Sequence, residues 1–341
     1  MANKQGFVSR LLGNDTLRAR LYDDLRDGSL SHAYILEGDA GSGKRTLARD
    51  LAAALACEKR ENHGAGGVLP CGSCPSCRKV LEGKSPDVIR IGRGERASIG
   101  VDDVRFLRSD VLVEPNDLEN KIYVIEDADA MTVQAQNALL LTLEEPPPYV
   151  LFLLLCRNAT MLLETIRSRA PILRLRPVPD APLRQCLTET SAAYVNLPEE
   201  EQRALVLMAN GSIGRARELL QDKARKVLMD RRRWVRDWIL CRADRKSYAS
   251  QLEVMQAVGT GREEAVVLLA EAERALCDLL MLKKSDDAPL GFFTDRDAAL
   301  ELSARFSAGA LLQWMEKTEQ ARGQLLRNGN VRLVLTELIL V

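Results

Sequence analysis

The sequence predicts an α/β domain with a parallel sheet, followed by a region that is helical throughout. As far as about residue 176, short apolar runs alternate with amphipathic segments. Strands that are separated by helices imply a parallel sheet covered on both faces. From about residue 178 the strand pattern disappears, and leucine and alanine recur at helical spacing. A cluster of prolines at positions 177, 179 and 182 marks the change.

The α/β part is expected to contain five strands and five helices. The strands are predicted at residues 33–36, 87–91, 121–126, 149–156 and 171–176. The helices are predicted at residues 15–27, 45–57, 101–109, 132–144 and 160–168. Asn14 or Asp15 is the candidate N-cap of the first helix, and Gly28 is its candidate end. Three prolines at 146–148 end the fourth helix, because proline cannot donate the backbone hydrogen bond that a helix needs.

With 341 residues, the chain is long enough for two or three domains. We expect an α/β domain at 1–177, a small helical unit at 178–222 and a larger helical domain at 223–341. The segment 223–246 carries ten Lys or Arg residues against three Asp. It is either a solvated helix face or a surface for an acidic neighbour or nucleic acid.

The composition limits the classes of function. Lys plus Arg and Asp plus Glu each number 48, so the net charge is zero. Proteins whose main affinity is for a phosphate backbone usually carry a basic excess. No run of about 18 uncharged apolar residues predicts a membrane span, and the first ten residues lack the apolar core of a signal peptide. We therefore expect a cytoplasmic protein whose eight cysteines are reduced.

A glycine-rich stretch at residues 38–45, GDAGSGKR, lies between a predicted strand and a predicted helix. It matches the phosphate-loop pattern G-x-x-x-x-G-K-[ST] at Gly38, Gly43 and Lys44. Gly41 adds the backbone freedom that such loops use. In such a loop, backbone N–H groups and the helix N-terminus hold phosphates, and the lysine reaches the terminal ones. The alternative is a strand-to-helix turn that binds nothing.

The last position of this pattern departs from it. Arg45 stands where a Ser or Thr normally ligates magnesium, and a guanidinium cannot do so. Thr46 comes one residue late, about 100° further around the helix, so its hydroxyl is expected to point elsewhere. The pattern therefore predicts the ancestry of a nucleotide site without predicting ATP hydrolysis.

Two acids at the end of a predicted strand form the second half of this candidate site. The stretch 121–129 reads KIYVIEDAD, and phosphate-loop ATPases hold magnesium and position water with acids at such a strand end. The usual order is Asp then Glu, but here Glu126 precedes Asp127, which is one methylene too short for the water-positioning role. Both halves of the magnesium site are thus altered. The alternative is a merely solvated strand end.

A cysteine cluster lies downstream of the predicted second helix. Cys71, Cys74 and Cys77 form C-x2-C-x2-C, and Cys57 stands at the end of the helix. Four thiolates at this spacing suit a tetrahedral structural zinc ion within a module at residues 57–77, and they leave no open position for catalysis. An iron–sulfur cluster is the alternative. The other four cysteines, at 156, 186, 241 and 277, are isolated on apolar stretches and are predicted to be core thiols.

These elements, in this order, resemble the bacterial DNA polymerase III clamp-loader ATPases of the AAA+ superfamily. The cysteine module after the phosphate-loop helix is the specific mark, and three further stretches match. They are SHAYILEG at 31–38, NALLLTLEEPP at 137–147 and the pair Ser168–Arg169. The resemblance covers about the first 220 residues. It implies an AAA+ phosphate-loop domain with an inserted zinc module, then a helical lid at 178–222 and an oligomerising helical collar at 223–341.

Within that family the resemblance implies one of two subunit types. A tau/gamma-type motor hydrolyses ATP, whereas a more rigid partner type does not. The motor's lid carries an arginine in a G-S-x-R motif, but here Gly214 fills that place and Arg215 follows it. Together with Arg45 and the order of the two acids, this departure resembles the partner type. We therefore expect no intrinsic ATPase activity and no secure ATP or Mg²⁺ binding; the alternative is an active motor.

The resemblance also implies partners. Other subunits, a tau/gamma motor and delta, would complete a hetero-pentameric ring that loads a sliding clamp on primed DNA. Arg169 would reach the neighbouring motor's ATP site as an arginine finger, although the family usually has Cys where Ala170 follows it. The alternative for Arg169 is a surface salt bridge. A third possibility for the chain is a zinc-ribbon nucleic-acid-binding module fused to a degenerate ATPase, which its neutral charge disfavours.

Overall fold

The computed structural model describes residues 6–7, 11–59, 68–244, 247, 250 and 261–340, and the chain divides into two compact units. Unit 1 comprises Met1–Leu183 together with Gly211–Arg215. Unit 2 comprises Arg184–Asn210 and Ala216–Val341. The division into three domains at 177 and 222 stays a prediction. Arg245 and Lys246 of the basic segment lie outside the described residues.

Unit 1 is built on a five-stranded parallel sheet in the order β4-β5-β6-β2-β7, which confirms the predicted α/β architecture. Its strands are β2 (Ala33–Glu37), β4 (Val88–Ile91), β5 (Lys121–Ile125), β6 (Val150–Cys156) and β7 (Ile172–Arg174). A separate two-residue parallel pair, β1 (Gly6–Phe7) with β3 (Val68–Leu69), was not expected from the sequence. Because β2 lies between β6 and β7, it is not an edge strand. The segment that follows β2 therefore begins at the carboxyl ends of the strands, where ligands bind in open α/β sheets.

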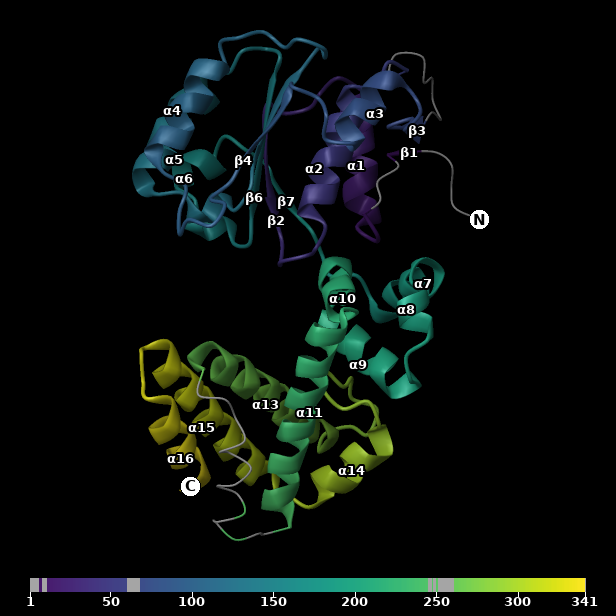
Figure 1. Ribbon diagram of the computed structural model, residues 1–341, viewed down its shortest axis with the longest axis vertical. Helices are drawn as coiled ribbons and strands as arrows, with labels where there is room; N and C mark the ends of the chain where they lie inside the picture. The colour runs from purple at the N-terminus through teal and green to yellow at the C-terminus, as the bar shows by residue number, and fades with distance from the viewer. Residues whose placement is uncertain are drawn as a thin grey trace. The chain divides into compact units, whose positions relative to one another are not determined.

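Helices cover both faces of this sheet (Figure 1). On one face lie α1 (Asp15–Arg26), α2 (Lys44–Leu55) and α3 (Pro75–Leu81). On the other lie α4 (Val101–Asp110), α5 (Val133–Glu144) and α6 (Glu164–Arg167). Alternate strand residues serve the two sides: Leu36 packs in the α1–α2 core, and its neighbour Ile35 packs in the α4–α5 core. Both faces are therefore apolar, which explains why the strands read as continuous hydrophobic runs.

Two local features of unit 1 differ in part from the expectation. Asn14 stands at the N-cap position of α1, as predicted, but its side chain makes no capping hydrogen bond. It adopts a left-handed φ of 57°, and its side chain bonds both backbone groups of Arg176 at 2.7 and 3.1 Å. The helix predicted at 160–168 is divided into a 3-10 turn, Ala159–Met161, and α6. The buried amide of Gln136 makes the interruption possible, since it accepts from the Leu163 N–H at 2.8 Å and donates to the Met161 carbonyl.

After β7, the described part of the chain contains helices and connecting segments only, as the sequence predicted. They are α7 (Asp180–Thr190), α8 (Ala192–Val195), α9 (Glu199–Ala209), α10 (Ile213–Leu219), α11 (Asp222–Ala243), α13 (Arg262–Leu282), α14 (Arg296–Ala304), α15 (Ala308–Leu326) and α16 (Val331–Leu340). A core at the meeting of α11, α13 and α15 contains Trp238 and Trp314, whose ring centroids are 4.7 Å apart. No helix among these or the other described residues has the length and apolar character that a bilayer crossing requires.

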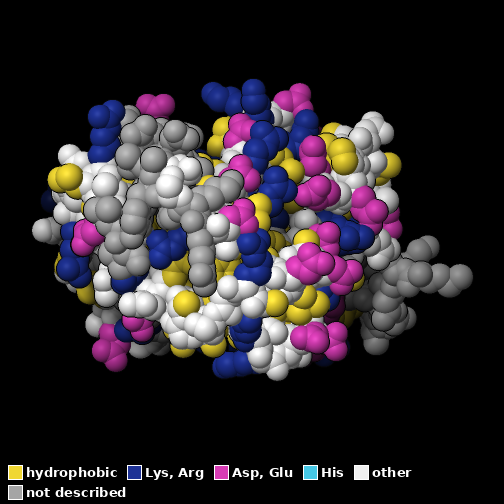
Figure 2. Space-filling view, turned by 90° about the horizontal axis from the view of Figure 1, so that it is seen from below, with side chains coloured by type: hydrophobic (Ala, Val, Ile, Leu, Met, Phe, Trp, Pro, Cys, Tyr) yellow, Lys and Arg dark blue, Asp and Glu magenta, His cyan; other side chains and the backbone are white. Residues whose placement is uncertain are grey.

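The basic segment of α11 is not simply a solvated face. Arg232 is buried, its guanidinium lies 4.4 Å from the centre of the Phe292 ring, and it donates to the Phe292 carbonyl. Burial lowers the pKa of Arg232. In Figure 2, basic and acidic side chains are both spread over the face that is displayed, in keeping with the zero net charge.

Candidate functional site

The phosphate loop, residues 38–43, joins β2 directly to α2, as the sequence predicts. Gly41 and Gly43 have left-handed φ values of 73° and 99°, which L-residues with side chains rarely adopt. A Cβ atom at Gly38 would lie 2.8 Å from the Ser42 hydroxyl and 3.3 Å from the Leu175 carbonyl oxygen, so the space around this glycine is tight. The loop therefore has the backbone shape that its sequence pattern indicates.

Lys44 does not extend away from the loop. Its Nζ donates to the carbonyl oxygens of Gly38 and Asp39 at 2.5 and 2.8 Å. Burial lowers the pKa of Lys44. The lysine that this motif uses for terminal phosphates thus contacts the loop's own backbone in this structure.

The two departures from the ATPase pattern lie against each other. Arg45 Nη2 is 2.5 Å from Glu126 Oε2, and the exposed fractions of the two side chains are 71% and 18%. Asp127 has a left-handed φ of 52° and pairs with Arg93, whose Nε lies 3.2 Å from its Oδ2. Thr46 lies within α2 and is partly buried. The structure therefore joins Arg45 to Glu126 and directs Asp127 to a different cation.

The turn at residues 211–215 packs on the phosphate loop. The Gly214 N–H donates to the Gly41 carbonyl at 3.2 Å, and the Ser212 hydroxyl donates to the Ala40 carbonyl at 3.2 Å. A Cβ atom at Gly214 would lie 2.8 Å from the Gly41 Cα, closer than real Cβ contacts allow. A side chain does not fit at position 214 in this arrangement, so the arginine that the resemblance places there in the motor type has no room.

The four predicted metal ligands come together. The sulfur atoms of Cys57, Cys71, Cys74 and Cys77 all lie within 4.8 Å of one another. Cys57 follows α2, Cys74 is the N-cap of α3 and Cys77 lies in the first turn of α3. With metal–sulfur bonds of about 2.3 Å, tetrahedral zinc has sulfur–sulfur edges of ~3.8 Å. The arrangement is close to what one ion needs, and the four residues fit a metal.

Hydrogen bonds and burial set unequal acidities within this cluster. The Cys74 and Cys77 N–H groups donate to the sulfurs of Cys71 and Cys74, both at 3.4 Å. Burial opposes ionisation of Cys71, but donors from Ser73 and Cys74 outweigh it and lower its pKa to about 6. Burial raises the pKa of Cys57 and that of Cys77. Ionisation of all four thiols therefore needs a positive charge such as a metal ion among them.

The other cysteines follow their prediction only in part. Cys156 and Cys241 are buried, as expected for core thiols. Cys186 is half-buried and Cys277 is exposed, so the prediction of a core position was wrong for Cys277. Cys277 lies on α13, where its apolar sequence neighbours Leu276 and Leu279 face the core instead. One residue is about 100° on a helix, which the apolar composition of the stretch did not reveal.

Arg169 stands directly after α6 and is held by α5 and α6 residues. Its Nη2 is 2.7 Å from Glu144 Oε1, and its Nη1 donates to the Thr165 carbonyl at 2.9 Å. The exposed fractions of Arg169 and Glu144 are 35% and 44%, so both remain accessible. Sequence reasoning missed the partners Glu144 and Arg93. A signal for Glu144 was present, since it lies in the matching stretch 137–147, but no pattern assigned it to Arg169.

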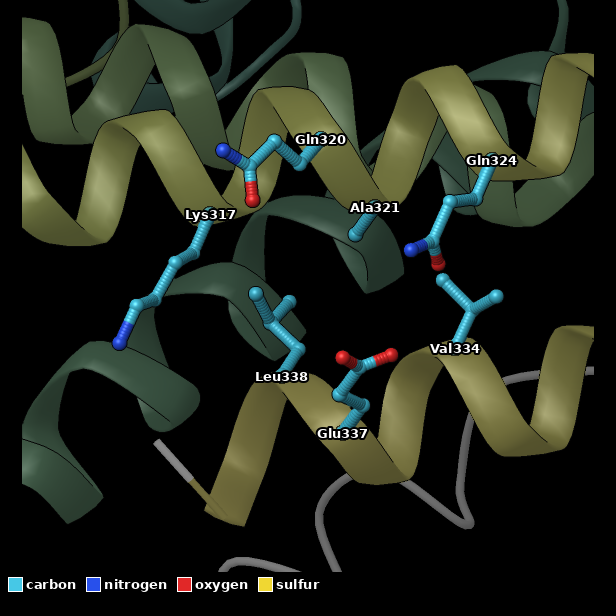
Figure 3. Close-up of a pocket in the computed structure, with 7 residues that line it drawn as sticks. All are labelled: Lys317, Gln320, Ala321, Gln324, Val334, Glu337 and Leu338. Atoms are coloured by element: carbon cyan, nitrogen blue, oxygen red, sulfur yellow. The ribbon is translucent and has the colours of Figure 1, made fainter.

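A separate pocket lies between α15 and α16. Figure 3 shows Glu337 and Gln324 directed into the space between the two helices, with Lys317 at one end. Its lining contains one acid and one base with two glutamines and three apolar residues, and it includes no cysteine or histidine. The pocket therefore carries no arrangement that favours a particular chemistry.

Comparisons with known proteins find similarity over the part of the chain that contains the site. The family model described as "DNA polymerase III, delta subunit" matches residues 13–179, which include the phosphate loop, the cysteine cluster, Glu126 and Arg169. The chain is 34% identical over 210 residues to the DNA polymerase III subunit tau/gamma of Haemophilus influenzae, covering 62% of this chain and 29% of that subunit. It is 36% identical over 183 residues to the DNA polymerase III subunit delta' of Pseudomonas aeruginosa, covering 53% of each.

A solved DNA polymerase III gamma subunit-related protein from Thermotoga maritima aligns with 89% of this chain and 99% of its own length, at 19% identity and a TM-score of 0.41. The chain spans 29% and 53% of the lengths of the two curated relatives. The family match, at residues 13–179, covers the α/β part and its site. Residues 13–179 are similar to the family described as "DNA polymerase III, delta subunit", and the chain is similar to the tau/gamma and delta' subunits of DNA polymerase III.

Proposed function

We propose that this chain is the delta-prime-type subunit of the DNA polymerase III clamp loader, and that it does not turn over ATP itself. The observation that carries the proposal is the contact of 2.5 Å between Arg45 and Glu126. In phosphate-loop NTPases the corresponding hydroxyl and acid hold Mg²⁺. Here a guanidinium replaces the hydroxyl and neutralises the acid, so the residues present do not fit the metal.

Arg169 is the residue through which this subunit acts on ATP. It would enter the ATP site of a neighbouring tau/gamma motor and stabilise the charge that develops on the transferring phosphoryl group. Its fork is held at one nitrogen by Glu144 and at the other by the Thr165 carbonyl, on an exposed segment after α6. Ala170, where the family has Cys, is buried in the α4–α5 core, so we interpret the difference as a change in packing.

The metal proposed for the cysteine cluster is zinc, with a structural role. Four sulfurs within 4.8 Å of one another complete a tetrahedral ion and leave no position for substrate. The metal would connect the end of α2 to the start of α3, since Cys57 follows one helix and Cys74 and Cys77 begin the other.

The helical regions are proposed to assemble the complex. The lid would comprise 178–222 and the oligomerising collar 223–341, in a hetero-pentameric ring with tau/gamma motors and delta. The ring would load a sliding clamp on primed DNA in the cytoplasm. Support comes from the 36% identity to the Pseudomonas aeruginosa delta' subunit and from the wholly helical character of the described residues after β7.

An active motor of the tau/gamma type is the alternative, and the 34% identity to a tau/gamma subunit favours it. ATP turnover separates the two. The purified chain alone should show no magnesium-dependent turnover, and adding it to tau/gamma and delta should raise the turnover of the mixture. Rapid magnesium-dependent hydrolysis by the pure chain would instead establish the motor.

Replacing Arg45 by threonine should create magnesium-dependent ATP binding. The change supplies the missing hydroxyl and removes the guanidinium from Glu126. Interactions with charged groups are worth about 1.5–3 kcal/mol, so the affinity should rise roughly ten- to a hundredfold. Titration calorimetry with and without Mg²⁺ measures this. The matched control is Lys79→Thr, which removes a cation from the exposed Lys79–Asp117 pair; if Arg45→Thr binds ATP no better than this control, position 45 does not disable the site.

A further inference from the structure

Both basic side chains at the end of the phosphate loop contact groups of this chain, and one of them meets an anion. Lys44 donates to two loop carbonyls, at Gly38 and Asp39. Arg45 pairs with Glu126, whose side chain is only 18% exposed. In a phosphate-binding loop such cations normally contact the bound phosphate. Here, the Glu126 carboxylate competes with a phosphate for Arg45.

A turn from later in the chain also supports the loop. The turn at residues 211–215 donates two hydrogen bonds to loop carbonyls, from Gly214 to Gly41 and from Ser212 to Ala40. Its close packing on Gly41 requires the glycine at 214. Both bonds go to carbonyl oxygens of the loop and use none of its backbone N–H donors, which face phosphates in such loops.

Arg45 does more than remove the hydroxyl that would ligate magnesium, because it adds a positive charge at the same position. A guanidinium is permanently charged and matches phosphate oxygens with two parallel N–H donors. If Glu126 did not hold it, Arg45 would stand at the start of α2, where the helix dipole also favours an anion. The positive charge that magnesium supplies in the ATPases would then come from the chain itself.

We propose that Arg45 is a built-in replacement for the metal and that Glu126 is the internal anion that keeps polyphosphates out of the loop. The inference rests on the proposed function, because it explains how this subunit keeps a phosphate loop without using ATP. Its ligand class is a nucleoside polyphosphate, which would bind without a divalent cation. The charge of Glu126 thus determines whether the loop can bind a polyphosphate.

Replacing Glu126 by glutamine should open the site to ATP in the absence of Mg²⁺. Glutamine keeps the size of the side chain but removes the charge that holds Arg45. Because the Arg45 side chain is largely exposed, the affinity should rise about fivefold over the wild type. Titration calorimetry in EDTA, with ATP as the probe, measures it. Arg45→Thr is expected to bind ATP only with Mg²⁺, whereas Glu126→Gln is expected to bind ATP without it. The metal dependence therefore distinguishes the two variants.

Two controls make the experiment decisive. Asp117→Asn removes an exposed acid from the Lys79–Asp117 pair and should bind ATP no better than the wild type. The double variant Arg45→Ala/Glu126→Gln should lose the gain, since the guanidinium is its source. The proposal is overturned if folded Glu126→Gln binds no more tightly than wild type, or if the double variant keeps the gain. Failure of the proposed function appears separately, as ATP hydrolysis by the unaltered chain.

Discussion

Replacing Cys77 by serine should abolish metal binding and destabilise unit 1. Cys77 is fully buried at the start of α3, and its sulfur lies 3.3 Å from the Ala53 carbonyl on α2. A structural zinc site contributes its binding free energy to folding, and values of about 10–16 kcal/mol are typical of zinc-finger peptides. Loss of one ligand should therefore lower the free energy of unfolding by more than about 4 kcal/mol.

Metal analysis and urea unfolding measure the two effects. The wild type should contain about one zinc ion per chain, and Cys77→Ser should contain none. The matched control is Cys277→Ser, because that thiol is exposed on α13 and lies outside the cluster. Iron in the freshly purified wild type, or no metal at all, would contradict the zinc assignment. Equal stability of the two serine variants would contradict the structural role.

Replacing Arg169 by alanine should leave the chain folded but slow ATP turnover in the reconstituted assembly. An arginine supplied in trans to a phosphoryl-transfer site is worth roughly 10³–10⁵ in rate. The salt bridge that the change removes from this chain, Arg169 with Glu144, is partly exposed and contributes about 1 kcal/mol or less to stability. Function and stability should thus respond very differently. Steady-state turnover of the assembly, beside thermal unfolding of the isolated variant, measures both.

Two further variants sharpen this test. Arg169→Lys keeps the charge but loses the planar fork, so it should remain strongly impaired. Arg203→Ala removes another arginine that pairs with an exposed glutamate, Glu199 on α9, and should turn over ATP normally. If the assembly with Arg169→Ala matches the wild type while still binding all partners, the arginine does not act in trans.

Much of unit 1 follows from patterns that are local in the sequence. The strands are continuous apolar runs because both faces of the sheet are covered, and this signal needs no knowledge of the strand order. Cys71, Cys74 and Cys77 are spaced so that one turn and the start of α3 bring them together. The phosphate loop is likewise a single stretch between β2 and α2.

Contacts between distant charged or polar residues could not be predicted. Arg169 meets a glutamate 25 positions away, and Asn14 bonds a backbone 162 positions away. Such residues are exposed or nearly so and leave no periodic pattern, because either side chain is equally stable in water on its own. Asn14 is an example. Its sequence context favours a side-chain capping hydrogen bond, but its side chain bonds the backbone of Arg176 instead.

By itself, the sequence determined that this protein has a parallel α/β domain, a four-cysteine cluster and a phosphate loop with an arginine at its last position, because each is encoded by neighbouring residues. Only the tertiary structure decided that Arg45 lies on Glu126 and that the turn at 211–215 packs on Gly41. These contacts depend on the order of strands in the sheet and on the return of the chain after β7. Sheet order is set by packing across the whole domain, which no local pattern records.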